Sequence, residues 1–429
     1  MKRRTLVIFV AFCSLFLIGK SAFSQEKSGK RWKMGAVPAI AYDADMGFRY
    51  GALSNFYDHG PDMELYPRYR HSIYAEWSHT TNGNDIKQMK YDSEYLIPGI
   101  RVTAIARLET EQAMDFYGFN GYESMYNASF ADYAQDDYKT RMYYRMGFQT
   151  LRLRADFQGK IIGRKLRWYG GLAYYNVKTN SVDIEKINQK KDEANQLPDV
   201  QGLYDEYVSA GIIPADQAGG GVTTQVNIGL VADTRDKEAN PNKGIWTELF
   251  LISAPGFIGN DNPYMGMVLT HRQYLPIIMN KLTFAYRLNY QTTLGGSAPW
   301  YMLAFKPDTY VSWNGLGGSK TLRGVMRNRV VGEGAVLGNF ELRWKFAQFN
   351  WLGQDWYLAL SPFVDAGKIT KKYANQPNMT GDKDGIHVGY GAGIHIALNE
   401  NFIIAVDYGI AADKRDGDSG MYIGLDFLF

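Results

Sequence analysis

The sequence predicts an all-β fold: a single transmembrane antiparallel β-barrel of about 16 strands, with one long surface loop folded into its lumen. Three observations lead to this prediction. The chain begins with an export signal, no later apolar run is long enough for a membrane-spanning helix, and apolar and polar residues alternate in many segments. The composition agrees, with 45 glycines, 31 tyrosines, 22 phenylalanines and 9 tryptophans.

Residues 1–24 have the order of a secretory signal peptide. Lys2, Arg3 and Arg4 precede an apolar run at 6–18, and the small residues Ala22 and Ser24 come before the expected cleavage point. The alternative is an uncleaved anchor, but the run is shorter than the ~20 residues that a spanning helix needs. We therefore expect a short periplasmic segment at 25–34 and the outer-membrane barrel at 35–429.

Removal of the signal changes the charge balance. The signal contains four of the 47 basic residues and none of the 44 acidic ones, so the mature chain has 43 basic against 44 acidic residues. This balance gives no support to a nucleic-acid partner. The single cysteine lies within the signal, so we expect no disulfide in the exported chain.

The alternation has a period of two residues, which a strand produces and a helix cannot. At the end of the chain, one face of a predicted strand carries Met421, Ile423, Leu425, Phe427 and Phe429. In a second segment, Phe340, Leu342, Trp344 and Phe346 oppose Asn339, Glu341, Arg343 and Lys345. The alternative is a soluble sandwich whose apolar face points to a core. The aromatic end at Phe429 favours the membrane barrel.

Sixteen strands are predicted near residues 35–42, 46–57, 69–79, 88–95, 100–110, 142–156, 166–178, 222–232, 244–252, 265–277, 281–292, 337–346, 356–366, 386–398, 402–411 and 421–429. An even number places both ends in the periplasm, with long loops at the cell surface. The long surface loops are expected at 111–141, 179–221, 293–336 and 367–385. Loop 179–221 contains two candidate short helices, but we interpret it as a solvated loop.

Several motifs in the second half resemble the Omp85 superfamily, the surface antigen D15 or BamA/TamA-like barrels. They are DTRDKEANPNKG at 233–244, TLRGV at 321–325, GNFELRW at 338–344, SPFVDAG at 361–367 and the closing LDFLF. The resemblance implies a barrel that helps polypeptides insert into, or cross, the outer membrane of a Gram-negative bacterium. It implies outer-membrane lipid, unfolded polypeptide clients and separate periplasmic proteins as partners. Because the barrel is predicted to start at residue 35, the chain resembles a short branch without periplasmic POTRA domains.

The glycine-rich stretch around TLRGV predicts an inward-folded loop. Asp365 shares its strand face with Phe363 and therefore points into the lumen, where a carboxylate needs a partner. An arginine can bind it with two parallel hydrogen bonds. We expect Arg323, between Leu322 and Gly324, to bind Asp365, with Glu341 as a second candidate. The alternative is that Arg323 is a solvated residue of a surface loop.

The resemblance also implies a family turn formed by Asp233, Arg235, Asp236, Pro241 and Gly244, and a C-terminal strand signal at Phe427 and Phe429. Pro38 lies in the first predicted strand. Because proline cannot donate a backbone hydrogen bond, Pro38 is a candidate for a lateral seam between the first and last strands. The alternative is a proline without any mechanistic role.

Enzymatic motifs are missing from the sequence. There is no G-x-S-x-G nucleophile elbow, no histidine pair with zinc-ligand spacing, and GGSKT separates glycine from lysine where a phosphate loop has them adjacent. We therefore expect no catalytic residues, no metal and no cofactor. The acidic turns at 382–385 and 413–420 leave a divalent cation open as an alternative to simple turn formation. A passive pore or structural barrel remains the alternative function.

Overall fold

The computed structural model describes residues 31–429, apart from 62–64, 66–68, 190, 239, 306, 310–314, 352, 399–401 and 426. The predicted signal segment and residues 25–30 lie outside the described residues. Within the described part, no helix is both long and apolar enough to cross a bilayer.

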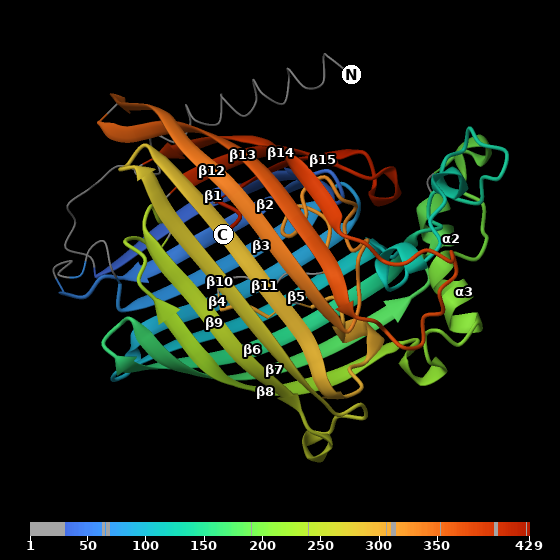
Figure 1. Ribbon diagram of the computed structural model, residues 1–429, viewed down its shortest axis with the longest axis horizontal. Coiled ribbons are helices and arrows are strands. Elements are labelled where there is room, and N and C mark those ends of the chain that lie inside the picture. Colours follow the sequence, from blue (N-terminus) through green and yellow to red (C-terminus); the bar gives the residue numbers. More distant parts are fainter. Residues whose placement is uncertain are drawn as a thin grey trace.

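Sixteen antiparallel strands form one closed barrel, as the sequence predicts (Figure 1). Their bounds are β1 Trp32–Asp43, β2 Gly47–Asp58, β3 His71–Thr80, β4 Asn84–Ile97, β5 Ile100–Asp115, β6 Arg145–Ile162, β7 Leu166–Asn180, β8 Gly220–Asp233, β9 Gly244–Ala254, β10 Tyr264–Ile278, β11 Leu282–Gly296, β12 Gly334–Trp351, β13 Gln354–Lys371, β14 His387–Leu398, β15 Phe402–Ala411 and β16 Ser419–Leu425. Each strand pairs with its neighbours in the chain, and β16 pairs with β1 to close the ring. Closure provides backbone partners that a bilayer cannot supply.

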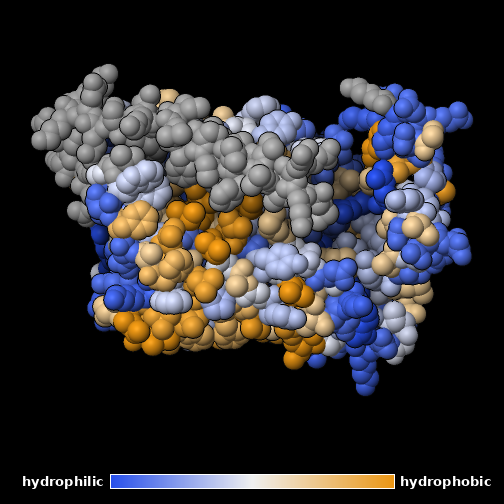
Figure 2. Space-filling view, turned by 90° about the horizontal axis from the view of Figure 1, so that it is seen from above, coloured by the Kyte–Doolittle hydropathy of each residue, from blue (hydrophilic) through white to orange (hydrophobic). Residues whose placement is uncertain are grey.

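The burial pattern confirms the predicted orientation of the side chains. On β12, Asn339, Glu341 and Arg343 are buried in the lumen, whereas Phe340 and Leu342 are exposed on the outer surface. On the side of the barrel seen in Figure 2, apolar residues cover much of the wall, and hydrophilic residues gather at the end that carries the long loops. This division fits a wall in contact with lipid and an end in contact with water.

The long loops pack against one another at one end of the barrel, to the right in Figure 1. Two short helices, α2 (Ile184–Asn188) and α3 (Leu203–Ser209), belong to the loop between β7 and β8. Tyr207 of α3 is buried against Phe116 and Phe119 of the β5–β6 loop, with ring centroids 5.4 and 6.2 Å apart. The interpretation of 179–221 as a solvated loop was therefore wrong for α3, because its aromatic face joins an apolar cluster.

The end of the chain also differs from the sequence prediction. The strand predicted at 421–429 ends at Leu425, and Phe427 and Phe429 lie in the lumen instead of facing lipid. The guanidinium of Arg343 lies 4.1 Å from the Phe427 ring centroid and 4.9 Å from that of Phe429. These cation–π contacts, which form only when the chain end turns inward, override the local alternation. At the other end, β1 begins at Trp32, so residues 32–34 of the predicted periplasmic segment belong to the barrel.

Candidate functional site: the loop in the lumen and the seam

The loop between β11 and β12 enters the lumen as a narrow hairpin. Leu316 and Val330 exchange two backbone hydrogen bonds of 3.1 Å, and Gly318 donates its backbone N–H to Val325. Leu322 is fully buried in an apolar cluster that includes Leu337 of β12 and Ile369 of β13. The hairpin is thus packed on the inner wall and is shielded from solvent.

Arg323, at the tip of this hairpin, binds three carboxylates of the wall. Its Nε and Nη2 atoms donate to Asp365 at 2.8 and 3.0 Å, and its backbone N–H donates to the same carboxylate at 3.1 Å. Its Nη1 atom lies 2.8 Å from Glu341 and 3.1 Å from Asp407. The guanidinium also stacks over the Phe363 ring at 3.5 Å. We call this cluster of Arg323, Asp365, Glu341 and Asp407 the arginine lock.

Neighbouring polar groups complete the lock. Asn339 donates from Nδ2 to Asp365 at 2.7 Å and to the Thr321 carbonyl at 2.6 Å. Arg343 donates to Glu341 at 2.9 Å, and His395 is 2.9 Å from Asp407. Two arginines and a histidine therefore face three buried carboxylates. This near-balance matters because a buried charge without a partner is costly.

The wall is shaped to receive the hairpin. A Cβ on Gly389 of β14 would lie 2.0 Å from the Arg323 carbonyl oxygen, and a Cβ on Gly409 of β15 would lie 2.6 Å from the Arg323 carbonyl carbon. Gly324 has φ +95°, and its backbone N–H donates to the Tyr422 hydroxyl on β16 at 3.1 Å. Glycine at these positions lets two backbones touch directly.

Two further contacts anchor the loop elsewhere on the wall. Asp308 binds Arg272 of β10 through its carboxylate and Arg154 of β6 through its carbonyl. Arg327 binds Glu111 of β5 with two hydrogen bonds of 2.7 and 2.6 Å. The loop is therefore held to β5, β6 and β10 as well as to the strands of the lock.

The predicted family turn lies at the periplasmic mouth, away from the lock. Arg235 binds Asp233 through Nε at 3.0 Å and Nη2 at 2.8 Å, and Asp236 accepts backbone N–H groups from the far side of the turn. Pro241 is buried, and Gly244, with φ +111°, starts β9. The turn reaches across to other strands, because its Asn240 donates to Tyr357 of β13 and its Asn242 accepts from Lys345 of β12. Beside it lies a cavity of about 270 Å³ lined by charged residues of β4–β7.

The C-terminal aromatics connect to the lock through Arg343. Its Nη2 atom donates to the main-chain oxygen of Phe429 at 2.9 Å, while its Nε atom binds Glu341 of the lock. Phe427 packs edge-on against His395, which binds Asp407. The inward-turned chain end and the loop are thus joined through one network.

The ring closes over a short seam. β1 pairs with β2 along its whole length, but among the described residues it pairs with β16 at two positions, Tyr42↔Ile423 and Asp43↔Tyr422. Residues 34–41 of β1 have no register partner on the described part of β16. Pro38 lies within this stretch and is opposite Ala52 of β2.

Arg323, Gly324, Leu322, Asp365 and Glu341 are therefore brought together as the sequence suggested, whereas the family turn and Pro38 lie apart from them. Sequence reasoning missed Asn339, Asp407, Tyr422, Gly389 and Gly409. A signal for Gly389 was present, since inward-facing glycines recur on β14 where large side chains would otherwise fill the lumen. Within the described residues, no group of three or more histidine, cysteine or acidic side chains is arranged to hold a metal ion.

A closed antiparallel barrel with a surface loop locked in its lumen defines the class of protein, an outer-membrane β-barrel with an internal plug. The Omp85 superfamily domain matches residues 78–427, and the chain belongs to this superfamily. The barrel fold and the family match together indicate the outer membrane of a Gram-negative bacterium.

Solved structures show the same fold. BamA from Haemophilus ducreyi lacking POTRA domains 1–3 aligns with a TM-score of 0.55 and 16% identity over 92% of this chain and 70% of that chain. CdiB from Escherichia coli aligns with a TM-score of 0.55 and 10% identity over 93% of this chain and 63% of that chain. No curated protein sequence matches the chain. At these identities the likeness is one of fold.

Replacing Arg323 with alanine is expected to destabilise the barrel, because Asp365, Glu341 and Asp407 would lose their shared cation. Breaking a buried ion pair from one side costs about 3–5 kcal/mol. Urea unfolding in phospholipid vesicles measures this loss. Arg164→Ala is the matched control, since Arg164 is largely exposed and its pair with Glu94 spans 3.4 Å. Equal unfolding free energies for the two variants would contradict the lock.

Adding a methyl group at Gly409 is expected to push the hairpin off the wall. The new Cβ would overlap the backbone of Arg323, so Gly409→Ala should lower the unfolding free energy by about 1–3 kcal/mol. The loop should also become accessible to protease. Gly170→Ala on β7 is the control, because the nearest atom to its Cβ is a tryptophan ring carbon at 3.6 Å. Protease resistance in both variants would argue against direct backbone contact.

Proposed function

We propose that this barrel assists the insertion of polypeptides into, or their translocation across, the outer membrane by opening between β1 and β16. The observation that carries the proposal is the short seam, which has two register pairs among the described residues, in a barrel whose interior is held by buried ion pairs. Opening the seam would expose a strand edge inside the membrane, and such an edge can pair with an incoming strand.

The backbone hydrogen bonding of β1 supports this role. Residues 34–41 have no register partner on the described part of β16, so an incoming strand could add main-chain hydrogen bonds along this edge. Pro38 removes one backbone donor from this stretch, which weakens pairing locally. A client strand would gain main-chain hydrogen bonds from the remaining residues, the mode of recognition known as β-augmentation.

The arginine lock supports the role from the other side of the seam. It joins the hairpin to Glu341 of β12, Asp365 of β13 and Asp407 of β15, and the Gly324 N–H binds Tyr422 of β16. Separation of β1 from β16 would leave all these contacts intact. The barrel would then open between β1 and β16 while the contacts of the arginine lock stayed in place.

Outer-membrane lipid and unfolded polypeptides are the partners that fit this role, and separate periplasmic proteins would deliver clients at the mouth beside the family turn. The proposal assigns no catalytic chemistry and no cofactor to the chain. A passive pore is the alternative function. It is disfavoured because the inward loop, the turn across the mouth and the chain end all occupy the lumen.

A disulfide across the seam tests the proposal. Cysteines at Tyr42 and Ile423, which are register partners, should close the seam when oxidised and abolish client assembly, with activity restored by reduction. The readout is the folding rate of a model outer-membrane protein in vesicles that contain the barrel. Cysteines at Leu172 and Val226, partners on β7 and β8, provide a control that should stay active when oxidised.

Full activity with an oxidised seam would reject the opening of β1 from β16. Planar-bilayer recording on the same preparation distinguishes the proposed function from a passive pore. A stable, large conductance in the unmodified protein would favour the pore, whereas the proposal expects a small conductance that the seam disulfide reduces further.

A further inference from the structure

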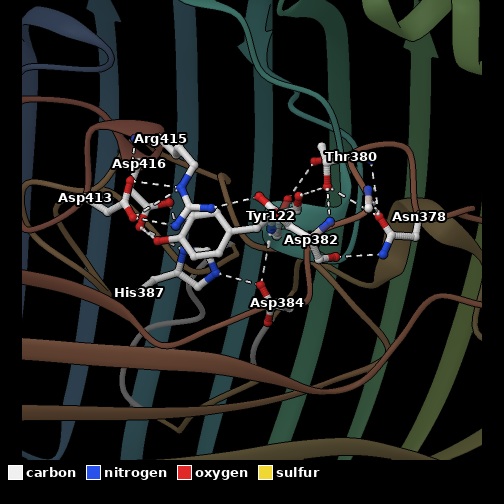
Figure 3. Close-up of polar contacts among 12 residues, drawn as sticks. Tyr122, Asn378, Thr380, Asp382, Asp384, His387, Asp413, Arg415 and Asp416 are labelled. Carbon is white, nitrogen blue, oxygen red and sulfur yellow. Dashed lines mark hydrogen bonds and ion pairs between the residues drawn. The ribbon is translucent and has the colours of Figure 1, made fainter.

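The buried side chain of His387 contacts two surface loops, the β13–β14 loop and the β15–β16 loop. His387, the first residue of β14, is fully buried, and its Nδ1 atom lies 2.8 and 2.9 Å from the two carboxylate oxygens of Asp416. Its Nε2 atom lies 2.9 Å from Asp384. Figure 3 shows the imidazole between these two carboxylates, which come from the β13–β14 loop and the β15–β16 loop.

This geometry fixes the proton content of the cluster. An ionised carboxylate only accepts hydrogen bonds, so the imidazole can bind both carboxylates only when both of its ring nitrogens donate. A neutral imidazole has one N–H group and would turn a lone pair toward one of the aspartates. The arrangement therefore requires an imidazolium, or one equivalent extra proton held on a carboxylate.

Residues of a third loop enclose the histidine. The Tyr122 ring lies 4.2 Å from the imidazole, centroid to centroid, and its hydroxyl donates to Asp416 at 2.7 Å. Gly121 has φ +58°, and a Cβ there would lie 2.1 Å from the Asp384 oxygen. Tyr122 and Gly121 belong to the β5–β6 loop, so three surface loops meet at one imidazole.

Tyr122 and Asp413, beside the cluster, do not change protonation state when the imidazole titrates. Burial, followed by the hydrogen bond to Asp416, raises the pKa of Tyr122, so its hydroxyl stays protonated. The hydrogen bond from Arg415 lowers the pKa of Asp413, which stays ionised. Arg415 stacks on the outer face of Tyr122 at 3.9 Å, and Arg329 of the lumen loop lies 3.9 Å from Asp416.

The His387 cluster is linked both to the lumen hairpin and to β16. Met326 of the lumen hairpin donates its backbone N–H to the Asp416 carbonyl at 2.8 Å, and Arg329 donates to the Arg415 carbonyl at 2.9 Å. The β15–β16 loop that carries Asp416 leads directly into β16 at Ser419. The two seam pairs involve Tyr422 and Ile423, in the middle of the described β16.

We propose that protonated His387 is a positioning residue of the seam: by binding Asp384 and Asp416 together it holds the loop that fixes the surface end of β16. This inference rests on the proposed opening between β1 and β16. Loss of the proton leaves a buried carboxylate facing a lone pair, so the β15–β16 loop detaches and the seam is freed at its surface end. The stabilisation is present at low pH and is lost as the pH rises through the titration of the bound imidazole.

The test measures the loop itself, so its outcome does not depend on client activity. A spin label on a cysteine replacing the exposed Lys414 of the β15–β16 loop reports local mobility in vesicles between pH 5 and pH 10. We expect one transition from an immobile to a mobile label as the pH rises. His387→Gln should abolish the transition, whereas His79→Gln, at a partly exposed histidine near the end of β3, should leave it unchanged.

A second variant keeps the test decisive if His387→Gln fails to fold. Asp384→Asn removes one anionic partner and should lower the transition midpoint by about one pH unit or more. Three outcomes would overturn the proposal. The midpoint could be unchanged or higher in Asp384→Asn, the mobility of the label in the unmodified chain could be independent of pH, or the transition could persist in His387→Gln. Failure of the seam disulfide experiment with this transition intact would reject the proposed function and leave the histidine contact standing.

Discussion

The buried guanidinium of Arg323 is the interaction on which the interior of this barrel depends. Three carboxylates from β12, β13 and β15 converge on it, and none of them would tolerate the lumen without a cation. The backbone approach at Gly389 and Gly409 brings the arginine within reach, and Asn339 and Arg343 satisfy the remaining acceptors. Because Arg343 also binds the main chain at Phe429, the chain end becomes part of the same network.

The location of this network determines where the barrel is weak. The lock crosses β12, β13 and β15 and contacts β16 through Tyr422, while the other loop anchors reach β5, β6 and β10. β1 takes no part in the lock, and among the described residues it meets β16 at two register pairs. Because the lock and the other loop anchors hold the remaining strands together, we expect the barrel to open between β1 and β16. The His387 cluster lies where the β15–β16 loop leads into β16. In our proposal, one proton on this cluster controls whether the surface end of the seam is held.

The strand number, order and orientation could be predicted because a period of two is present in most strands, whatever their neighbours are. The Arg323–Asp365 pair was predictable because the inward face of β13 is legible from sequence and the loop motif supplied the arginine. Asp407, Tyr422 and Gly409 were not predictable, because they meet the loop only after the barrel has closed. The direction of Phe427 and Phe429 was mispredicted for the same reason: Arg343, the cation that draws them inward, belongs to a distant strand.

Motion confined to the seam is the central claim, and spin-label distances across it test this claim most directly. Labels at Tyr50 of β2 and Tyr408 of β15 span the seam, and labels at Leu172 of β7 and Leu269 of β10 span an equal number of strands elsewhere. In lipid, the account predicts a broad or two-component distance distribution for the first pair and a single narrow one for the second. Equally narrow distributions for both pairs would contradict it.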